Sequence, residues 1–453
     1  MQANQTLNAR DLLPAVNRCL QLASRKTILL DRRWKHSDGA PVITAAGRYT
    51  TRSWTQWTQG FQYGNALLCF ELTGDRDLLA IGQRHVVADM AEHVTHIGVH
   101  DHGFNNISTY GNLRRLMLEG RIPINEWELH FCELALQASG AVQAARWTPI
   151  KDGLGYIYSF NGPQSLFIDT MRTLRICCMA DMLGHALQGE QDQRIDLLER
   201  ALAHAKTSAR YNVYYGEGRD HYDVPELRGR TVHEALFNPV SGVFRAPASQ
   251  QGYSPFSTWT RGLAWSMLGF PELIEFLAGH PPEEQEALPI FEKAARACCD
   301  FYMQQASALD GICYWDTGAP QLHRLGDWQA RAADPYNEYE PVDASASAIA
   351  AQGLLRLGHL LGSGGKAYTQ AGLTIAARLL EEPYLSVQED HEGLLLQSIY
   401  HRPNGWDYTP PGAKVPCGES SMWGDYHLLE LCLLLTRMAN SSYYTFFGIH
   451  HAG

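Results

Sequence analysis

The segment Gly162–Ala180, GPQSLFIDTMRTLRICCMA, carries the strongest local indication of the fold. Its apolar residues recur at steps of three and four, which predicts a helix with one buried face running from Leu166 to Leu187. One acid, Asp169, lies in the first turns of that helix. Two interpretations compete: a carboxylate that satisfies free N–H groups at a helix start, or a catalytic acid whose pKa is raised by apolar neighbours.

The same periodicity recurs along the chain and predicts about a dozen helices. They are Leu12–Leu22, Trp57–Leu72, Leu78–Val94, Trp127–Val142, Leu166–Leu187, Ile195–Ala205, Leu263–Leu277, Leu288–Tyr302, Ala346–Leu361, Tyr368–Leu380 and Met422–Leu435, with Asn105–Leu118 as a weaker case. Strand-like alternation is limited to short candidates at Gly242–Arg245 and Leu394–Tyr400, which could form hairpins on a rim.

A helix, a turn and a second helix repeat about every forty to fifty residues, which is typical of an α-solenoid or a toroid of helical hairpins. Long aromatic loops at 211–258 and 310–343 favour the toroid, because such loops usually line a site. No Gly-, Ser- or Pro-rich linker divides the chain, so we predict one all-α domain over residues 1–453. The aromatic segment Ser441–Gly453 is predicted to dock on the body or on a partner.

Bulk composition narrows the possible partners. The 453 residues carry a net charge of −11 and no basic block, which argues against nucleic acid and anionic membranes. The first residues lack the apolar stretch of a signal peptide, so a cytoplasmic protein is expected. The ten cysteines show no CxxC spacing and are predicted to be reduced core thiols. No phosphate-binding glycine loop, HExxH or GxSxG motif indicates a cofactor, a metal or a serine nucleophile.

Two further segments contain chemically useful residues. In VHDHGF, His100, Asp101 and His102 are consecutive, which invites a metal interpretation, but no cluster of Asp, Glu or Cys accompanies them. In STWTRGLAW, Arg261 and Trp265 are four residues apart and Trp259 precedes them, so a guanidinium and two indoles share one region. That group suits a carboxylate-bearing sugar; the alternative is a structural arginine stacked on core tryptophans.

Six motifs in one order resemble those of unsaturated glucuronyl hydrolases, glycoside hydrolase family 88. They are VHDHGF, FIDTM, STWTRGLAW, DASASAIAAQGLLRL, GLLLQSIYHRPNG and WGDYHLLE, and they span roughly residues 50–438. The resemblance implies an (α/α)6 barrel that acts on oligosaccharides with a Δ4,5-unsaturated uronic acid at the non-reducing end. It implies hydration of the C4=C5 bond without metal or cofactor, after which the sugar ring opens and the remaining saccharide leaves.

The resemblance also assigns roles. It implies that Asp169 is the acid and base, which calls for a carboxyl group protonated near working pH. Asp101 would be the second acid, raising the pKa of Asp169 and sharing its proton. Substrate-binding positions implied by the motifs are His100, His233, Gln251, Trp259, Arg261 and Trp265.

Three positions depart from the family pattern. Gln62 stands where a tryptophan usually follows Gly-Phe, although Trp54 and Trp57 are close; Gln250 stands where histidine often precedes Gln-Gly-Tyr; and His102 replaces an apolar residue. These changes leave the preferred sugar, its linkage and its sulfation open.

Other functions remain as alternatives. An unsaturated rhamnogalacturonyl hydrolase (family 105-like) would share the barrel and the mechanism. A sugar epimerase would use histidine-based proton transfer, and a non-catalytic sugar-binding barrel would need the aromatic residues but not both acids. A monomer or a homodimer is expected.

Overall fold

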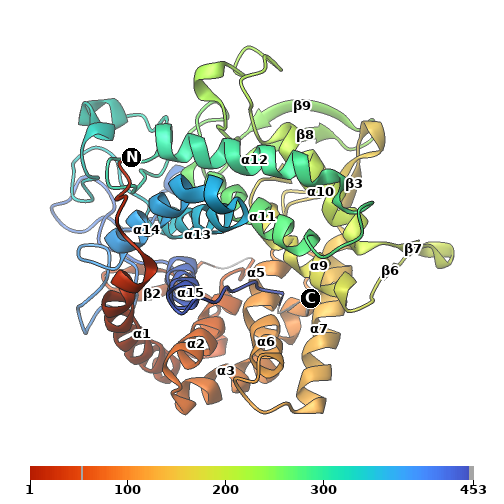
Figure 1. Cartoon of the computed structure of the whole chain (residues 1–453), viewed down its shortest axis with the longest axis horizontal. Coiled ribbons are helices and arrows are strands. Elements are labelled where there is room, and N and C mark those ends of the chain that lie inside the picture. Colours follow the sequence, from red (N-terminus) through yellow and green to blue (C-terminus); the bar gives the residue numbers. More distant parts are fainter. Residues whose placement is uncertain (53–54, 448–453) are drawn as a thin grey trace.

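The computed structural model describes residues 1–52 and 55–447 and shows a closed ring of helical hairpins (Figure 1). Within these residues, six outer helices alternate along the chain with six inner segments, and each inner segment contacts its two neighbours around the ring. The outer helices are α1 (Leu13–Arg33), α3 (Arg76–Asp89), α7 (Glu126–Ala145), α10 (Leu197–Tyr211), α12 (Leu288–Phe301) and α14 (Lys366–Leu379). The predicted toroid is thereby confirmed.

The inner segments are α2 (Gln59–Thr73), α5 (His102–Asn106) continuing through a π-helical turn into α6 (Asn112–Leu118), α8 (Thr170–Thr173) with α9 (Arg175–Met182), α11 (Thr260–Leu277), α13 (Ala344–Leu360) and α15 (Met422–Ala439). A short helix, α4 (Ala91–Val94), precedes α5. The weaker prediction at 105–118 is therefore helical and begins three residues earlier than expected.

Inner segments are buried on nearly all sides and approach one another closely. A Cβ placed on Gly103 of α5 would lie 2.3 Å from the carbonyl oxygen of Thr173, and one on Gly353 of α13 would lie 2.4 Å from that of Met267. Only glycine fits at contacts this short, so these two residues set the spacing between adjacent inner segments.

Short strands lie on the rim of the ring. The strands β5 (Ser165–Phe167), β8 (Glu234–Asn238) and β9 (Val243–Ala248) form an antiparallel sheet in the order β5-β8-β9. Three two-stranded pairs are β1 (Pro41–Ala45) with β2 (Arg48–Thr51), β3 (Trp147–Pro149) with β4 (Gly155–Ile157), and β6 (Leu187–Gln188) with β7 (Arg194–Ile195). The strand predicted at 242–245 is confirmed by β9, whereas 394–400 makes only isolated bridges through Leu395 and Leu396.

The helix predicted from Leu166 to Leu187 is wrong at both ends. Leu166 and Phe167 belong to β5, where Phe167 pairs with Glu234 of β8, and the helical segment begins only at Thr170. It ends at Met182, before Gly184 takes a φ of +75°. A short apolar run fits a buried strand as well as a helix, so periodicity alone could not separate them.

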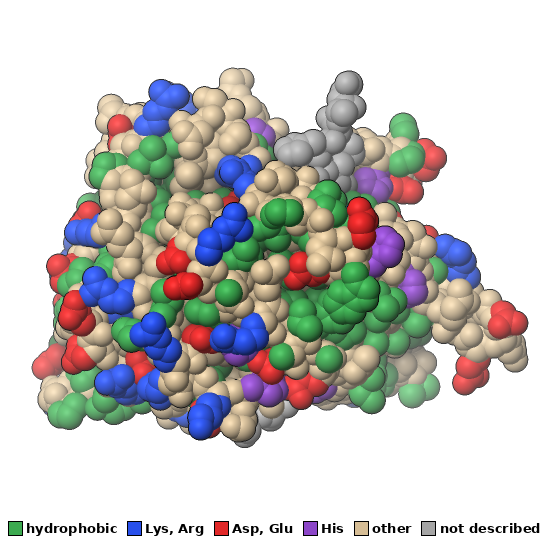
Figure 2. All heavy atoms as spheres, turned by 90° about the horizontal axis from the view of Figure 1, so that it is seen from below, with side chains coloured by type: hydrophobic (Ala, Val, Ile, Leu, Met, Phe, Trp, Pro, Cys, Tyr) green, Lys and Arg blue, Asp and Glu red, His purple; other side chains and the backbone are tan. Residues whose placement is uncertain are grey.

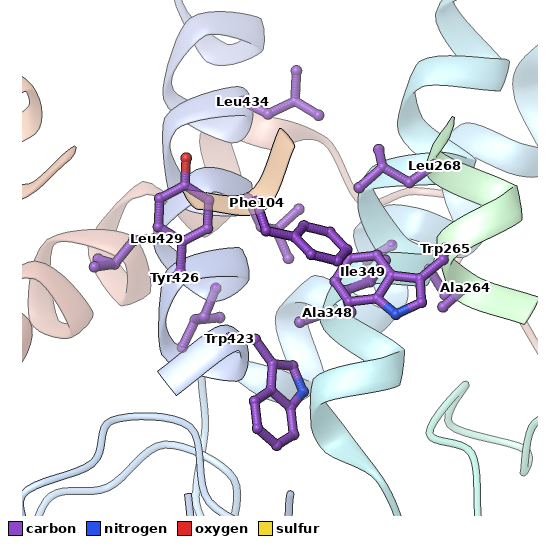
Figure 3. Close-up of a cluster of buried hydrophobic side chains, with 14 of the residues drawn as sticks. Phe104, Ala264, Trp265, Leu268, Ala348, Ile349, Trp423, Tyr426, Leu429 and Leu434 are labelled. Atoms are coloured by element: carbon purple, nitrogen blue, oxygen red, sulfur yellow. The ribbon is translucent and has the colours of Figure 1, made fainter. Parts of the chain in front are cut away.

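The middle of the ring is filled by side chains. Figure 3 shows Phe104 of α5 pointing toward Trp265 of α11, with Ile349 of α13 and residues of α15 around them. The rings of Phe104 and Trp265 are 4.8 Å apart. This apolar layer forms a floor across the ring.

A buried ionic layer lies beyond that floor. Arg172 of α8 donates to Glu272 of α11 and to Glu430 of α15, and Arg356 of α13 donates to Glu275 at 2.7 Å. The chain after α15 covers this layer: Arg356 donates to the carbonyl oxygen of Tyr444, and the Arg175 guanidinium lies 4.8 Å from the Phe446 ring. The described part of the aromatic tail therefore docks on the body; residues 448–453 lie outside the described residues.

The outer surface carries an apolar stripe on α7. Trp127 and Leu134 are 67% and 66% exposed, and Ile124 and Leu118 extend the stripe toward α6. Figure 2 shows apolar side chains gathered on the face that contains the lower helices of Figure 1.

Among the described helices, none combines the length and hydropathy needed to span a bilayer.

Candidate active site

A cavity of about 420 Å³ opens at one end of the ring, where the inner segments begin. It is lined by Thr55, Trp57, His100, Asp101, Phe104, Phe160, Asn161, Asp169, Gln250, Gln251, Trp259, Arg261, Trp265, Tyr400, His401 and Asn404. Seven of the eight predicted site residues are in this set, and His233 lies behind the wall. A concave site with aromatic walls and a few polar groups is typical of small-molecule binding.

Two carboxylates and one imidazole meet at the floor of the cavity. Asp101 immediately precedes α5 and Asp169 immediately precedes α8, so two neighbouring inner segments bring them together. His100 lies between them: its Nε2 is 3.8 Å from Asp101 Oδ1 and 3.9 Å from Asp169 Oδ1. All three side chains are buried.

The geometry separates the two interpretations of Asp169. The residue occupies the N-cap position of α8, but its side chain makes no capping hydrogen bond. Oδ1 of Asp169 has no hydrogen-bond partner among the described residues, although it is buried. A buried carboxylate oxygen without a hydrogen bond is costly unless a ligand or water completes it, so this acid serves the cavity rather than the helix.

The pKa of Asp169 shifts in the direction opposite to the one predicted. Burial alone would raise it, but His100 and then His233 lower it below its usual range. The rise that was expected for Asp169 is found at Asp101 instead. Burial raises the pKa of Asp101, His100 opposes this rise, and the charge of Asp169 adds to it. The prediction of a raised Asp169 pKa is therefore wrong: His100, which lies between the two acids, and His233 together outweigh burial.

His233 supports one wall of the cavity from behind. Its Nδ1 accepts hydrogen bonds from the backbone N–H groups of Gln250 and Gln251, at 3.0 and 3.4 Å. Burial lowers its pKa to about 4, so the ring is neutral at pH 7 and carries its proton on Nε2. The residue thus positions the Gln250–Gln251 turn, and both glutamines line the cavity.

Arg261 is committed to protein groups. Its guanidinium donates to Asp343 Oδ2 and Gln251 Oε1, both at 2.9 Å, to the carbonyl oxygen of Tyr400 at 2.7 Å, and to that of Ile399. It also lies between two indoles, 4.6 Å from Trp259 and 4.8 Å from Trp423.

With four acceptors already bound, Arg261 matches the structural alternative rather than a free carboxylate ligand. Its contacts orient Gln251 and fix the 399–400 segment, whose Tyr400 lines the cavity. The residue therefore shapes the site by positioning its neighbours.

Trp57, Trp259 and Trp265 also line the cavity, and Trp57 supplies the aromatic face that the sequence departure at Gln62 had put in doubt. Trp57 stacks on Trp423 at 5.0 Å and donates to the Tyr400 hydroxyl at 3.3 Å. Gln62 faces a separate small cavity lined by Lys26, Tyr63 and Asp425. The other candidate, Trp54, lies outside the described residues.

Two other polar residues, His102 and Asp425, have structural roles. Both ring nitrogens of His102 are engaged, with Ser139 Oγ at 2.8 Å and the His96 carbonyl oxygen at 3.0 Å. Asp425 accepts from the backbone N–H groups of Leu394 and Leu395 and from the Tyr49 hydroxyl.

Sequence reasoning missed several cavity residues. Phe160, Asn161, Thr55 and Asn404 line it without belonging to the residues singled out from the motifs. Asn161 stands beside a Gly-Pro pair, a turn signal that could have marked it; Phe160 carries no comparable signal.

Nearly the whole chain is similar to proteins named as hydrolases, although no protein-family model matches it. It is 26% identical to an unsaturated glucuronyl hydrolase of Bacillus sp. (strain GL1) over 443 residues, covering 95% of this chain and 98% of that protein. It is 25% identical to an unsaturated chondroitin disaccharide hydrolase of Streptococcus pyogenes serotype M1, covering 92% and 90%.

The fold is also similar to solved structures of unsaturated glucuronyl hydrolases. The unsaturated glucuronyl hydrolase structure from Bacillus sp. GL1 superposes with a TM-score of 0.68 at 22% identity, covering 93% of this chain and 96% of that one. An unsaturated glucuronyl hydrolase specific for heparin gives 0.71 at 20% identity, covering 94% and 98%. These likenesses confirm the resemblance predicted from the six motifs and the predicted fold.

Proposed function

We propose that this chain hydrolyses oligosaccharides that carry a Δ4,5-unsaturated uronic acid at the non-reducing end, by hydrating the C4=C5 bond. The observation that carries the proposal is the pair of buried carboxylates, Asp101 and Asp169. Both face one cavity, and neither side chain caps the helix that it precedes. The names of the relatives support it: unsaturated glucuronyl hydrolase and unsaturated chondroitin disaccharide hydrolase.

In the proposed reaction Asp169 acts first as acid and then as base. Its carboxyl proton is transferred to C4, and a positively charged centre develops at C5, next to the ring oxygen. Water adds to C5 as Asp169 takes a proton from it, which restores the carboxyl group. The hemiketal at C5 opens the ring, and the remaining saccharide leaves with its hydroxyl protonated. Asp101, across His100, supplies negative charge that stabilises the developing cation.

The surroundings suit an anionic sugar in an acidic protein. Helices α2 and α11 begin beside the cavity, and the partial positive charge at these ends favours a substrate carboxylate. Trp57, Trp259 and Trp265 supply flat apolar surfaces for sugar rings, and Gln251 supplies a fixed amide.

We further propose that the enzyme works in the cytoplasm, as a monomer or a homodimer. The location is supported by its ten unpaired cysteines, nine of them buried, which is the usage expected in a reducing compartment. Light scattering on the purified protein would decide the oligomeric state.

An ultraviolet assay tests the function directly, because hydration of C4=C5 removes the absorbance of the conjugated alkene. The panel contains lyase products of chondroitin, heparin, hyaluronan, xanthan and rhamnogalacturonan. Loss of absorbance with a glucuronyl product supports the proposal. Loss of absorbance with the rhamnogalacturonan product alone would instead identify the protein as an unsaturated rhamnogalacturonyl hydrolase. Folded protein that leaves every absorbance unchanged refutes both.

A further inference from the structure

His100 is unlike the other buried histidines of the described chain. His93, His102, His204, His233, His391, His401 and His427 each have at least one ring nitrogen hydrogen-bonded to a protein group. Both ring nitrogens of His100 are buried without any such partner. Its ring lies 5.5 Å from the Phe167 ring and 6.2 Å from the Phe160 ring, and its Nε2 faces the carboxylates of Asp101 and Asp169. Among the described residues, no hydrogen bond to a protein group therefore requires an imidazole here.

The charges around His100 favour an imidazolium. Two carboxylates face it, Asp101 at the start of α5 and Asp169 at the start of α8. The opposing groups are Arg146 at the end of α7, and the rings of His204 on α10 and His233 just before β8. Burial lowers the pKa of both rings, to about 3 for His204 and about 4 for His233, so these two are neutral at pH 7.

The third opposing group, the Arg146 guanidinium, is already hydrogen-bonded to protein groups. The Arg146 guanidinium donates to the carbonyl oxygens of Tyr158, Ser159 and Ile97 and is not aimed at the acids. Burial lowers the pKa of His100, but Asp101 and Asp169 outweigh it and the net shift is upward.

We infer that His100 holds, between the two acids, the proton that Asp169 delivers to the substrate, and recovers it after each turnover. Its Nε2 is nearly equidistant from Asp101 and Asp169, at 3.8 and 3.9 Å, so a movement of about 1 Å would bring it within hydrogen-bond distance of either. Such tightening is common when a substrate fills an active site. His100 would act through Asp169 and is therefore a positioning residue for the proton. This inference rests on the proposed function.

The proton balance is closed. In the free enzyme Nε2 of His100 carries the proton and Asp169 is ionised. Binding of the substrate excludes water from the cavity, and this desolvation favours the neutral pair of a protonated Asp169 and an uncharged His100 over the two opposite charges. The Nε2–H bond breaks and an O–H bond forms on Asp169, leaving a neutral imidazole. After water has added to C5 and returned a proton to Asp169, the reverse transfer recharges His100.

The pH profile of His100→Gln distinguishes a proton store from a structural residue. In the wild type, kcat/KM should fall as pH rises through the elevated pKa of His100, because the stored proton is lost. Without the imidazolium, Asp169 must hold its own proton, so the alkaline limb should move to lower pH. We expect a loss of about 100-fold at pH 7.5 that shrinks to less than about tenfold at pH 5. His130→Gln, on the exposed face of α7, is the matched control and should leave the profile unchanged.

A loss by the same factor at every pH would overturn the inference, as would an unshifted alkaline limb. A second measurement is independent of turnover: NMR titration of the His100 ring, identified by its absence from the His100→Gln spectrum. Its pKa should exceed the ordinary value of about 6.5 and fall in both Asp101→Asn and Asp169→Asn. A His100 pKa at or below that value would refute the role of His100 as a proton store, whichever substrate the enzyme uses. Inactivity of the wild type on the whole panel would count against the proposed function instead.

Discussion

Replacing Arg261 with methionine would test whether its guanidinium holds the protein together or binds the substrate. Methionine keeps an apolar stem between Trp259 and Trp423 but removes all four hydrogen bonds of the guanidinium. It also leaves Asp343, which is fully buried, without its cation. Breaking a buried ion pair by removing one partner typically costs about 3–5 kcal/mol of unfolding free energy.

The magnitude can be separated into its parts by a double-mutant cycle. Asp343→Asn removes the charge but can keep the Oδ1 contacts with the Ser345 and Ala346 N–H groups at the start of α13. Arg261→Met in that background should therefore cost less than in the wild type, by a coupling energy of about 1–3 kcal/mol.

Urea unfolding followed by far-ultraviolet circular dichroism measures these differences. Arg84→Met is a matched control: Arg84 pairs with Asp31 at 2.7 Å, but its side chain is 56% exposed, so the loss should stay below about 1 kcal/mol. An Arg261→Met protein as stable as that control, with only KM raised, would refute the argument and return Arg261 to the substrate-binding role implied by the motifs.

Three further substitutions and one treatment test other parts of the site. Asp169→Asn should lower kcat by about 10²–10⁴-fold with little change in KM; unchanged steady-state turnover would remove it as the acid. Asp425→Asn should lower the unfolding free energy by about 1–3 kcal/mol but leave kcat of the folded enzyme intact, and a selective fall in kcat would place it in the mechanism. Gln62→Met should leave kcat/KM unchanged at a stability cost below about 1.5 kcal/mol, since an altered KM would mean that position 62 reaches the substrate. Added chelator should not alter the rate, and a loss of activity would restore a metal role for His100 and His102.

Helical periodicity located the ring because its signal is local. The predictions at 263–277, 346–361 and 422–435 correspond to α11, α13 and α15, whose apolar residues repeat over four or more turns. Motif order then identified Asp101 and Asp169, which the fold brings to adjacent helix starts.

Two properties could not be predicted from the sequence, the hydrogen bonds of Arg261 and the pKa of Asp169, because both depend on residues far away in the chain. Arg261 donates to residues 82, 138 and 139 positions away, so nothing near it in the chain indicates that its donors are occupied. The apolar neighbours of Asp169 indicated a raised pKa, but the deciding group is His100, 69 positions earlier. Burial can be inferred from local pattern, whereas the sign of an electrostatic shift requires knowing which charge lies opposite.

The filled centre of the ring restricts which polymers can be cut. Phe104 and Trp265 close the cavity below the acids, and the Arg172–Glu272–Glu430 layer blocks the passage further down. A saccharide therefore cannot thread through the ring; it enters by one end to a fixed depth and leaves by the same opening. Cleavage is accordingly confined to chain termini, one terminal sugar for each encounter. Internal bonds of a long polymer stay out of reach until another enzyme has cut it and exposed new ends.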